Sequence, residues 1–148
     1  MVLLSLCELY ICPELDMGIC IFLLYLFSPE KLLVLVRENK TWKEALQYCR
    51  ERHVDLVSVT SEQIQRWVRG RVKEASSAHV WLGLRHSCNL GFWFWGESEF
   101  RMWASGQPDN LGGRQTCGQI SSSGLWWDSY CGNVKAFICY DQGKLSNT

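Results

Sequence analysis

The residues that decide how this chain folds are WASGQPDN at 103–110, Cys117, WWDSYC at 126–131 and FIC at 137–139. One amide and two acidic side chains, Gln107, Asp109 and Asp128, flank a proline and follow a tryptophan pair in this stretch. Proteins bind Ca²⁺ with about six to eight oxygen ligands drawn from such groups and from the backbone. Proline, Asp and Asn are also ordinary turn residues. The stretch alone therefore predicts either an oxygen-lined loop that faces a cation or a simple turn.

Another motif lies N-terminal to this stretch, and together the motifs follow one another in a characteristic order. In sequence they are WLGL at 81–84, WASGQPDN at 103–110, Cys117, WWD at 126–128 with Cys131, and FIC at 137–139. This set resembles the C-type lectin domain over residues 35–140. The resemblance implies an α+β, C-type lectin-like fold with two helices, small antiparallel sheets and a long irregular loop region that carries the site. It also implies disulfides between Cys49 and Cys139 and between Cys117 and Cys131.

The resemblance further implies a sugar site. In the C-type lectin family the Gln-Pro-Asp triplet accompanies galactose-type ligands, and a bound Ca²⁺ ion coordinates two adjacent sugar hydroxyls. Carried over to this sequence, the carbohydrate-binding residues are Gln107, Asp109, Gln115 and Asp128, and the metal ligands are Gln107, Asp109 and Asp128.

Three positions depart from the family pattern. Gln115 is neutral where the family usually has Glu, Trp127 replaces an Asn ligand, and Leu111 stands near the usual place of a stacking aromatic residue. Two charged donors remain. Because Ca²⁺ affinity falls with the charge of the ligand set, we expect a dissociation constant of about 10⁻³ M or weaker.

Length and composition favour one disulfide-bonded domain. The chain has 148 residues, zero formal net charge, eight cysteines and eight tryptophans. This length fits one domain plus an extension, and the neutral balance gives no electrostatic basis for binding nucleic acid. Cysteine richness in a short chain favours an oxidising compartment, so we expect a secreted or extracellular protein.

The chain divides into an apolar extension at 1–34, a C-type lectin-like domain at 35–141 and a polar tail at 142–148. The apolar run at 17–29 is shorter than the roughly 20 residues of a membrane-spanning helix, so it does not support membrane anchoring through a full-length span. It matches the core of a secretory signal peptide. Glu14 and Asp16 stand where a signal peptide is positively charged, and an artefact of the gene model is the alternative. No partners are assigned to Cys7, Cys12 and Cys20.

The first part of the domain predicts a strand at 33–37 and then a helix. Asn39, Lys40 and Thr41 form an N-glycosylation sequon, so Asn39 is a predicted glycan site. Thr41 and Glu44 form a capping box at the start of the helix. Its apolar face is formed by Trp42, Ala45, Leu46 and Cys49.

A second helix is predicted after residue 60. Thr60 and Gln63 repeat the capping pattern, and the apolar stripe consists of Ile64, Trp67, Val68 and Val72. The opposite face carries the basic residues Arg66, Arg69, Arg71 and Lys73. Such a face either binds an anionic partner or is simply solvated.

The chain then becomes rich in strands. Residues 80–84 predict a buried strand, and the aromatic run at 92–95 predicts a second strand. Its rings could form a binding surface, but in a small domain such rings more often belong to the core. Cys88 between them is free, pairs with an N-terminal cysteine, or links two chains.

The sequence favours recognition over catalysis. It shows no third group to orient a Cys88–His86 pair, no glycine-rich phosphate loop and no metal-hydrolase motif, so we do not expect an enzyme. The leading hypothesis is a lectin domain that binds a glycan or a cell-surface glycoprotein, with galactose preference and weak or absent dependence on Ca²⁺ as cofactor. The alternative is a calcium-independent module that binds proteins.

Overall fold

The computed structural model describes residues 32–87, 90–95, 98–110 and 116–141. Gln115, Leu111, Cys88 and the three N-terminal cysteines lie outside these ranges. The elements in chain order are β1 (Leu33–Lys40), α3 (Trp42–Arg52), β2 (Asp55–Leu56), α4 (Glu62–Val72), β3 (His79–Ser87), β4 (Phe92–Phe94), β5 (Thr116–Ser121), β6 (Trp126–Tyr130) and β7 (Lys135–Tyr140). Within the described part, neither helix has the length and apolar character needed to cross a bilayer.

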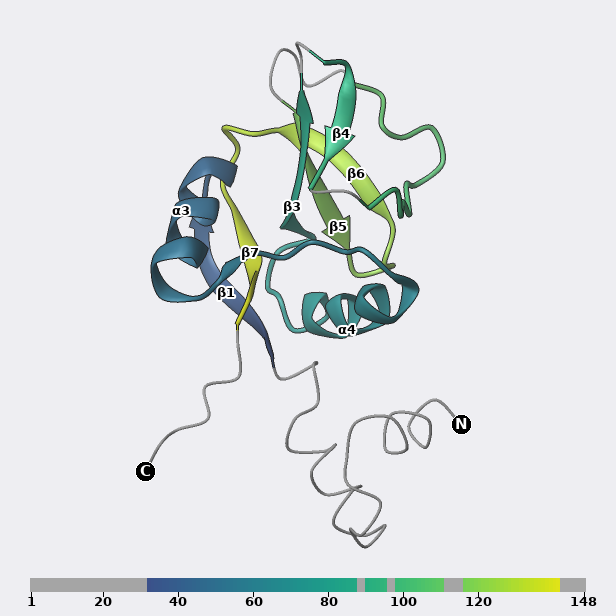
Figure 1. Cartoon of the computed structure of the whole chain (residues 1–148). Helices are drawn as coiled ribbons and strands as arrows, with labels where there is room; N and C mark the ends of the chain where they lie inside the picture. Colours follow the sequence, from purple (N-terminus) through teal and green to yellow (C-terminus); the bar gives the residue numbers. More distant parts are fainter. Residues whose placement is uncertain (1–31, 88–89, 96–97, 111–115, 142–148) are drawn as a thin grey trace, which may run out of the picture.

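The strands form one mixed sheet with the order β1-β7-β3-β5-β6; β2 pairs with β7 and β4 pairs with β3. In Figure 1, α3 lies beside β1 and β7, whereas α4 lies across one end of β3 and β5. The α+β fold class is confirmed. The separate antiparallel sheets are replaced by a single sheet, because β3 pairs in parallel with β7 at Trp81 and Phe137.

The helix α3 begins where the capping box predicts. The Glu44 amide donates to the Thr41 hydroxyl over 3.3 Å, and the Thr41 amide donates to the Glu44 carboxylate over 2.9 Å. The hydrogen bond from the Thr41 backbone lowers the pKa of Glu44. Trp42, Ala45 and Cys49 are buried and Leu46 packs against the same cluster, so the predicted apolar face is confirmed.

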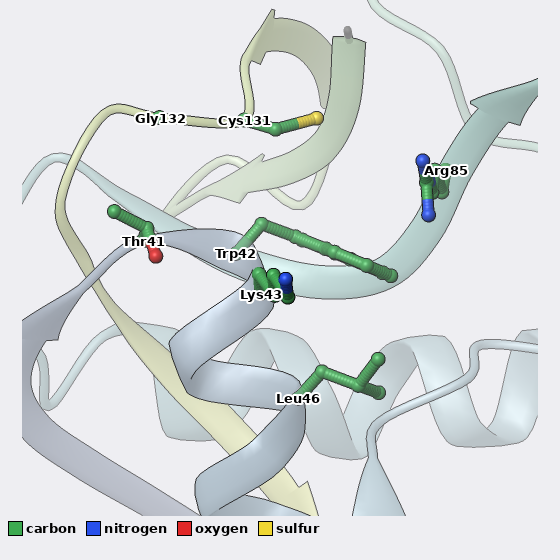
Figure 2. Close-up of a pocket in the computed structure, with 7 residues that line it drawn as sticks. All are labelled: Thr41, Trp42, Lys43, Leu46, Arg85, Cys131 and Gly132. Carbon is green, nitrogen blue, oxygen red and sulfur yellow. The ribbon is translucent and has the colours of Figure 1, made fainter.

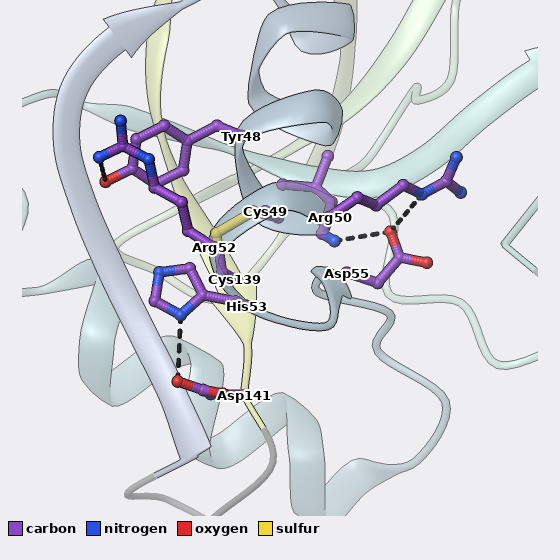
Figure 3. Close-up of a disulfide and its surroundings, with 9 residues drawn as sticks. Tyr48, Cys49, Arg50, Arg52, His53, Asp55, Cys139 and Asp141 are labelled. Carbon is purple, nitrogen blue, oxygen red and sulfur yellow. Dashed lines mark hydrogen bonds and ion pairs between the residues drawn. A yellow bond between two sulfur atoms is a disulfide. The ribbon is translucent and has the colours of Figure 1, made fainter.

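The disulfide between Cys49 and Cys139 joins α3 to β7 (Figure 3). Two polar contacts surround it. His53 Nδ1 lies 3.0 Å from the Asp141 carboxylate, and Arg50 Nε lies 3.2 Å from Asp55. His53 therefore ties the end of α3 to the residue that follows β7.

The cap of α4 differs from the prediction. The hydroxyl of Ser61, and not that of Thr60, accepts the amide of Ile64 over 3.3 Å, because Ser61 has the extended backbone of an N-cap. Val68 and Val72 are buried and Ile64 and Trp67 pack against them, which confirms the apolar stripe.

The basic face of α4 is partly neutralised by acidic residues in α4 and just after it. Arg66 pairs with Glu62 over 3.2 Å, and Arg71 pairs with Glu74 over 3.6 Å. Ion pairs between such exposed side chains contribute little to stability, as expected for a solvated surface.

The aromatic run at 92–95 is only partly in the core, which corrects the prediction. Phe92 is 51% exposed and Phe94 is 39% exposed, whereas Trp93 packs edge-on against Trp103 with ring centroids 4.8 Å apart. The reason is the alternation of side chains along β4. Phe94 pairs with Arg85 and Phe92 with Ser87, so both rings share the outward face of the β3–β4 hairpin.

Candidate functional site

The Gln-Pro-Asp loop lies against the start of β6. The Ala104 amide donates to the Trp126 carbonyl over 2.9 Å, and the Trp126 amide donates to the Met102 carbonyl over 2.9 Å. Trp126 itself is fully buried, and its indole N–H donates to Gln65 of α4 over 2.9 Å. The loop is therefore fastened to a residue that the core holds in place.

The structure brings Gln107, Asp109 and Asp128 together in a closed set of hydrogen bonds. The Gln107 amide group donates to the Asp109 carboxylate over 3.0 Å, and Gln107 Oε1 accepts the Asp128 backbone N–H over 3.2 Å. The Asp128 carboxylate accepts the backbone N–H groups of Asp109, over 3.2 Å, and of Asn110, over 2.8 Å. The peptide bond between Gln107 and Pro108 is cis.

Asn110 is the residue of this set that sequence reasoning missed. Its backbone has φ +56°, and its N–H donates to the Asp128 carboxylate. Asn tolerates the left-handed region better than most residues. An Asn directly after the triplet is therefore the sequence feature that could have predicted this role. The fourth predicted sugar ligand, Gln115, lies outside the described residues.

A second disulfide holds the strand that carries Asp128. Cys117 of β5 is bonded to Cys131, which directly follows β6. Between these cysteines, β5 and β6 pair in register, with Gly118 opposite Asp128. Both disulfides implied by the resemblance are therefore present in the structure.

Trp127 does not face the Gln-Pro-Asp loop. Neighbouring side chains of a strand point to opposite faces, so Trp127 is turned away from the face of Asp128. Its ring meets the ring of His79 edge-on, with centroids 6.1 Å apart. Burial lowers the pKa of His79, and the nearby charge of Lys135 lowers it further.

The oxygen donors of the site fit a Ca²⁺ ion in part. The side chains of Gln107, Asp109 and Asp128 offer two carboxylates and one amide oxygen, three of the roughly six to eight ligands that Ca²⁺ takes, and the amide oxygen already accepts the Asp128 N–H. Among the described residues no group of three or more His, Cys, Asp or Glu side chains could hold a metal ion. The lone pairs of Asp128 already accept two backbone N–H groups, although a carboxylate has about four acceptor positions. These oxygen donors therefore suit a site that binds Ca²⁺ with low affinity.

The predicted glycan acceptor Asn39 is an exposed residue near the end of β1. The hydroxyl of Thr41, the third residue of the sequon, accepts the Glu44 amide in the folded protein.

Residues 38–141 match the family model of the lectin C-type domain, and the chain belongs to this family. Rat asialoglycoprotein receptor 2 is 36% identical over 113 residues, which cover 70% of this chain and 36% of the receptor. Human lithostathine superposes with a TM-score of 0.67 at 26% identity, over 75% of this chain and 83% of that one. The lectin domain of cow CD23, solved in the presence of an oligosaccharide, gives a TM-score of 0.63 at 27% identity over 72% and 84%.

This chain spans about a third of the length of the curated receptors that it matches. The matched relatives are lectins and receptors, and the comparison therefore concerns their C-type lectin domain.

Proposed function

We propose that this domain binds carbohydrate, presented as a glycan or as a cell-surface glycoprotein, at the loop formed by Gln107, Asp109 and Asp128. The observation that carries the proposal is a set of four hydrogen bonds that links Gln107 to Asp109 and to the Asp128 backbone, and the Asp128 carboxylate to the backbone of Asp109 and Asn110. Family membership supports it, as do a relative named as an asialoglycoprotein receptor and a neighbour solved in the presence of an oligosaccharide. We further propose a preference for galactose, which rests on the Gln-Pro-Asp triplet.

We propose weak or absent dependence on Ca²⁺. Gln107, Asp109 and Asp128 would hold the ion, which supplies a positive centre for two adjacent sugar hydroxyls when bound. The residues themselves supply two negative charges and orient the donors through the hydrogen bonds between them. A ligand set of this charge suits a dissociation constant of about 10⁻³ M or weaker.

Thermal melting with Ca²⁺ or chelator, with and without galactose, tests this function. A ligand at ten times its dissociation constant adds about 1.4 kcal/mol, which raises the Tm of a domain of this size by about 5 °C. We expect Asp109→Ala to abolish any shift. Ser105→Ala, an exposed change in the same loop, is the control and should keep it. Mannose that shifts the Tm as much as galactose would contradict the proposed preference.

A calcium-independent module that binds proteins is the second candidate. The observation that favours it is that each of the three side chains already has a hydrogen-bond partner within the loop. If about 10 mM Ca²⁺ and galactose leave the Tm of the wild type unchanged, this candidate replaces the first.

We propose a secreted or extracellular location, supported by the two disulfides, which persist in oxidising compartments. Expression in secretory cells should yield a protein whose mass falls on removal of N-glycans, and Asn39→Gln should remove this difference. Reduced cysteines in freshly isolated native protein would contradict the location.

A further inference from the structure

A groove opens between α3 and the β3–β4 hairpin, and it shares no lining residue with the Gln-Pro-Asp loop. Its first part is a pocket of about 460 Å³, where Trp42 reaches from α3 toward β3 and Arg85 stands on the opposite wall (Figure 2). A second pocket of about 290 Å³ shares Trp42, Leu46 and Arg85 with the first and extends to Phe94 and to Asp55, whose carboxylate is paired with Arg50 over 3.2 Å. The two pockets therefore adjoin at the three shared residues, and together they are called the groove.

The walls of this groove are preformed. The indole N–H of Trp42 donates to the Leu82 carbonyl of β3 over 2.8 Å, and the backbone N–H of Trp42 donates to the Cys131 carbonyl over 3.0 Å. Cys131 is fixed in turn by its disulfide to Cys117. A rigid surface loses little conformational entropy when a ligand binds.

The first pocket carries two cations that lack a carboxylate partner. Lys43 and Arg85 are both exposed and form no ion pair within the described part of the chain. The guanidinium of Arg85 lies over the ring of Trp42, 5.7 Å from its centroid. The neighbouring carboxylate of Glu44 accepts the Thr41 amide at the start of the helix. The pocket therefore presents positive charge that an anionic group would complement.

Beside these cations lies apolar surface. Phe94 and Phe92 are on the same face of the hairpin as Arg85, and their rings meet edge-on with centroids 6.0 Å apart. Leu46 lies one turn along α3 from Trp42 and lines both pockets. Aromatic residues and arginine grouped in this way are typical of the residues that dominate protein–protein binding energy.

The side chains of the first pocket are poorly suited to a sugar. A sugar ring presents several hydroxyl groups, yet the lining residues that the structure describes include no carboxylate and no side-chain amide to accept from them. The single hydroxyl in the lining, that of Thr41, already accepts the Glu44 amide. An acidic peptide requires only what is present, cations for its carboxylates and apolar surface for its aliphatic side chains.

We propose that this groove binds an acidic peptide segment of a partner protein. Carboxylates of the segment pair with Lys43 and Arg85, and an aliphatic side chain packs on Leu46 and Phe94. The proposal does not depend on sugar binding at the Gln-Pro-Asp loop, because the two surfaces have separate residues.

The probe for this site is a fluorescein-labelled decapeptide of Glu with two central Leu residues, measured by fluorescence anisotropy. We expect it to bind about ten-fold more tightly than the same peptide with Gln in place of Glu. Lys43→Gln and Arg85→Gln should each weaken binding about three- to ten-fold and reduce its dependence on salt. Lys73→Gln removes one exposed charge from the end of α4 and serves as the matched control, with unchanged affinity.

Two further variants separate this site from others. Asp109→Ala should leave peptide binding unchanged, so that failure at the Gln-Pro-Asp loop does not affect this test. Phe94→Ser should weaken binding of the Glu peptide and of the Gln peptide by the same factor. It removes an apolar contact and leaves the charge of the groove unchanged. Tm measurements on each variant confirm that it is folded.

Three results would overturn the proposal. The first is equal affinity for the Glu and Gln peptides, and the second is binding that the variants of Lys43 and Arg85 do not change. The third is a sulfated hexasaccharide that binds more tightly than the peptide and depends on the same two residues, which would assign the groove to anionic glycans.

Discussion

Two regions of this domain are held together in different ways. In the frame formed by α3, β3 and β7, the residues Ala45, Cys49, Trp81, Phe137 and Cys139 are almost completely removed from solvent. In the Gln-Pro-Asp loop, Gln107, Asp109 and Asp128 keep contact with solvent and hold one another by hydrogen bonds. Apolar burial is the larger source of stability, whereas exposed polar contacts contribute little but fix direction. We therefore expect changes in the frame to affect folding and changes in the loop to affect recognition.

The largest expected effects concern the two disulfides. Replacing Cys49 and Cys139 with Ala removes a link across 90 residues, which costs about 4–5 kcal/mol in the chain-entropy model. Replacing Cys117 and Cys131 removes a link across 14 residues and costs about 3 kcal/mol. Urea unfolding of each double variant measures the two losses.

In a binding experiment the order of the two effects should be reversed, and loss of the Cys117–Cys131 link should have the larger effect. Loss of the Cys117–Cys131 link frees the strand pair that carries Asp128, so ligand binding should weaken while the domain is still folded. Selective reduction of that bond with no change in ligand binding would show that the loop does not need it. Equal losses of stability for the two disulfides would contradict the comparison.

Substitutions of two glycines, one in the frame and one in the loop, test the same comparison with smaller expected effects. A Cβ atom at Gly83 in β3 would lie 2.9 Å from the Leu56 carbonyl oxygen and 3.0 Å from that of Val57, and both are backbone atoms that β2 and the core hold in place. We expect Gly83→Ala to cost about 3 kcal/mol, at the upper end of overpacking changes. A thermal melt reports this loss directly.

In the loop, Gly106 has free space around it but a φ of +76°, which strains a residue with a side chain. Gly106→Ala should cost about 1 kcal/mol and should weaken ligand binding more than Gly83→Ala does. If Gly106→Ala destabilises the fold more than Gly83→Ala, the assignment of the frame to folding and of the Gln-Pro-Asp loop to recognition is wrong.

Local signals in the sequence predict the frame well. The capping box of Thr41 and Glu44 and the apolar face of α3 depend on residues three or four positions apart, and the structure confirms both. The two disulfides were implied by resemblance, since spacing alone leaves several pairings open. The α4 cap was placed one residue early because Thr60 and Ser61 are both good cap residues, and the backbone conformation selects between them.

The features that sequence reasoning missed depend on contacts between distant residues. The exposure of Phe92 and Phe94 follows from their register with β3, which no local pattern reports. Likewise, the groove exists because β3 places Arg85 beside Trp42, 43 positions earlier in the chain. At the Gln-Pro-Asp loop the resemblance implies a shared site for Gln107, Asp109 and Asp128, but no pattern in the sequence predicts that Asp128 accepts the Asn110 amide.

The smallest predicted effect is a pH dependence at the junction of the two regions. His79 contacts Trp127 of β6, and burial, aided by the charge of Lys135 on β7, lowers its pKa. An unfolded chain then binds more protons than the folded one between this lowered pKa and about 6.5. The free energy of unfolding is therefore fully retained above about pH 6.5 and decreases as pH falls through the folded pKa.

Urea unfolding between pH 8 and pH 5, with wild type and His79→Gln compared at each pH, isolates this contribution. His53 and His86 are present in both proteins, so their contributions cancel in the difference. We expect the variant to lose less stability on acidification than the wild type. Parallel curves would mean that His79 is as well solvated in the folded protein as in the unfolded chain, and that its contact with the Trp127 ring does not shield it from water.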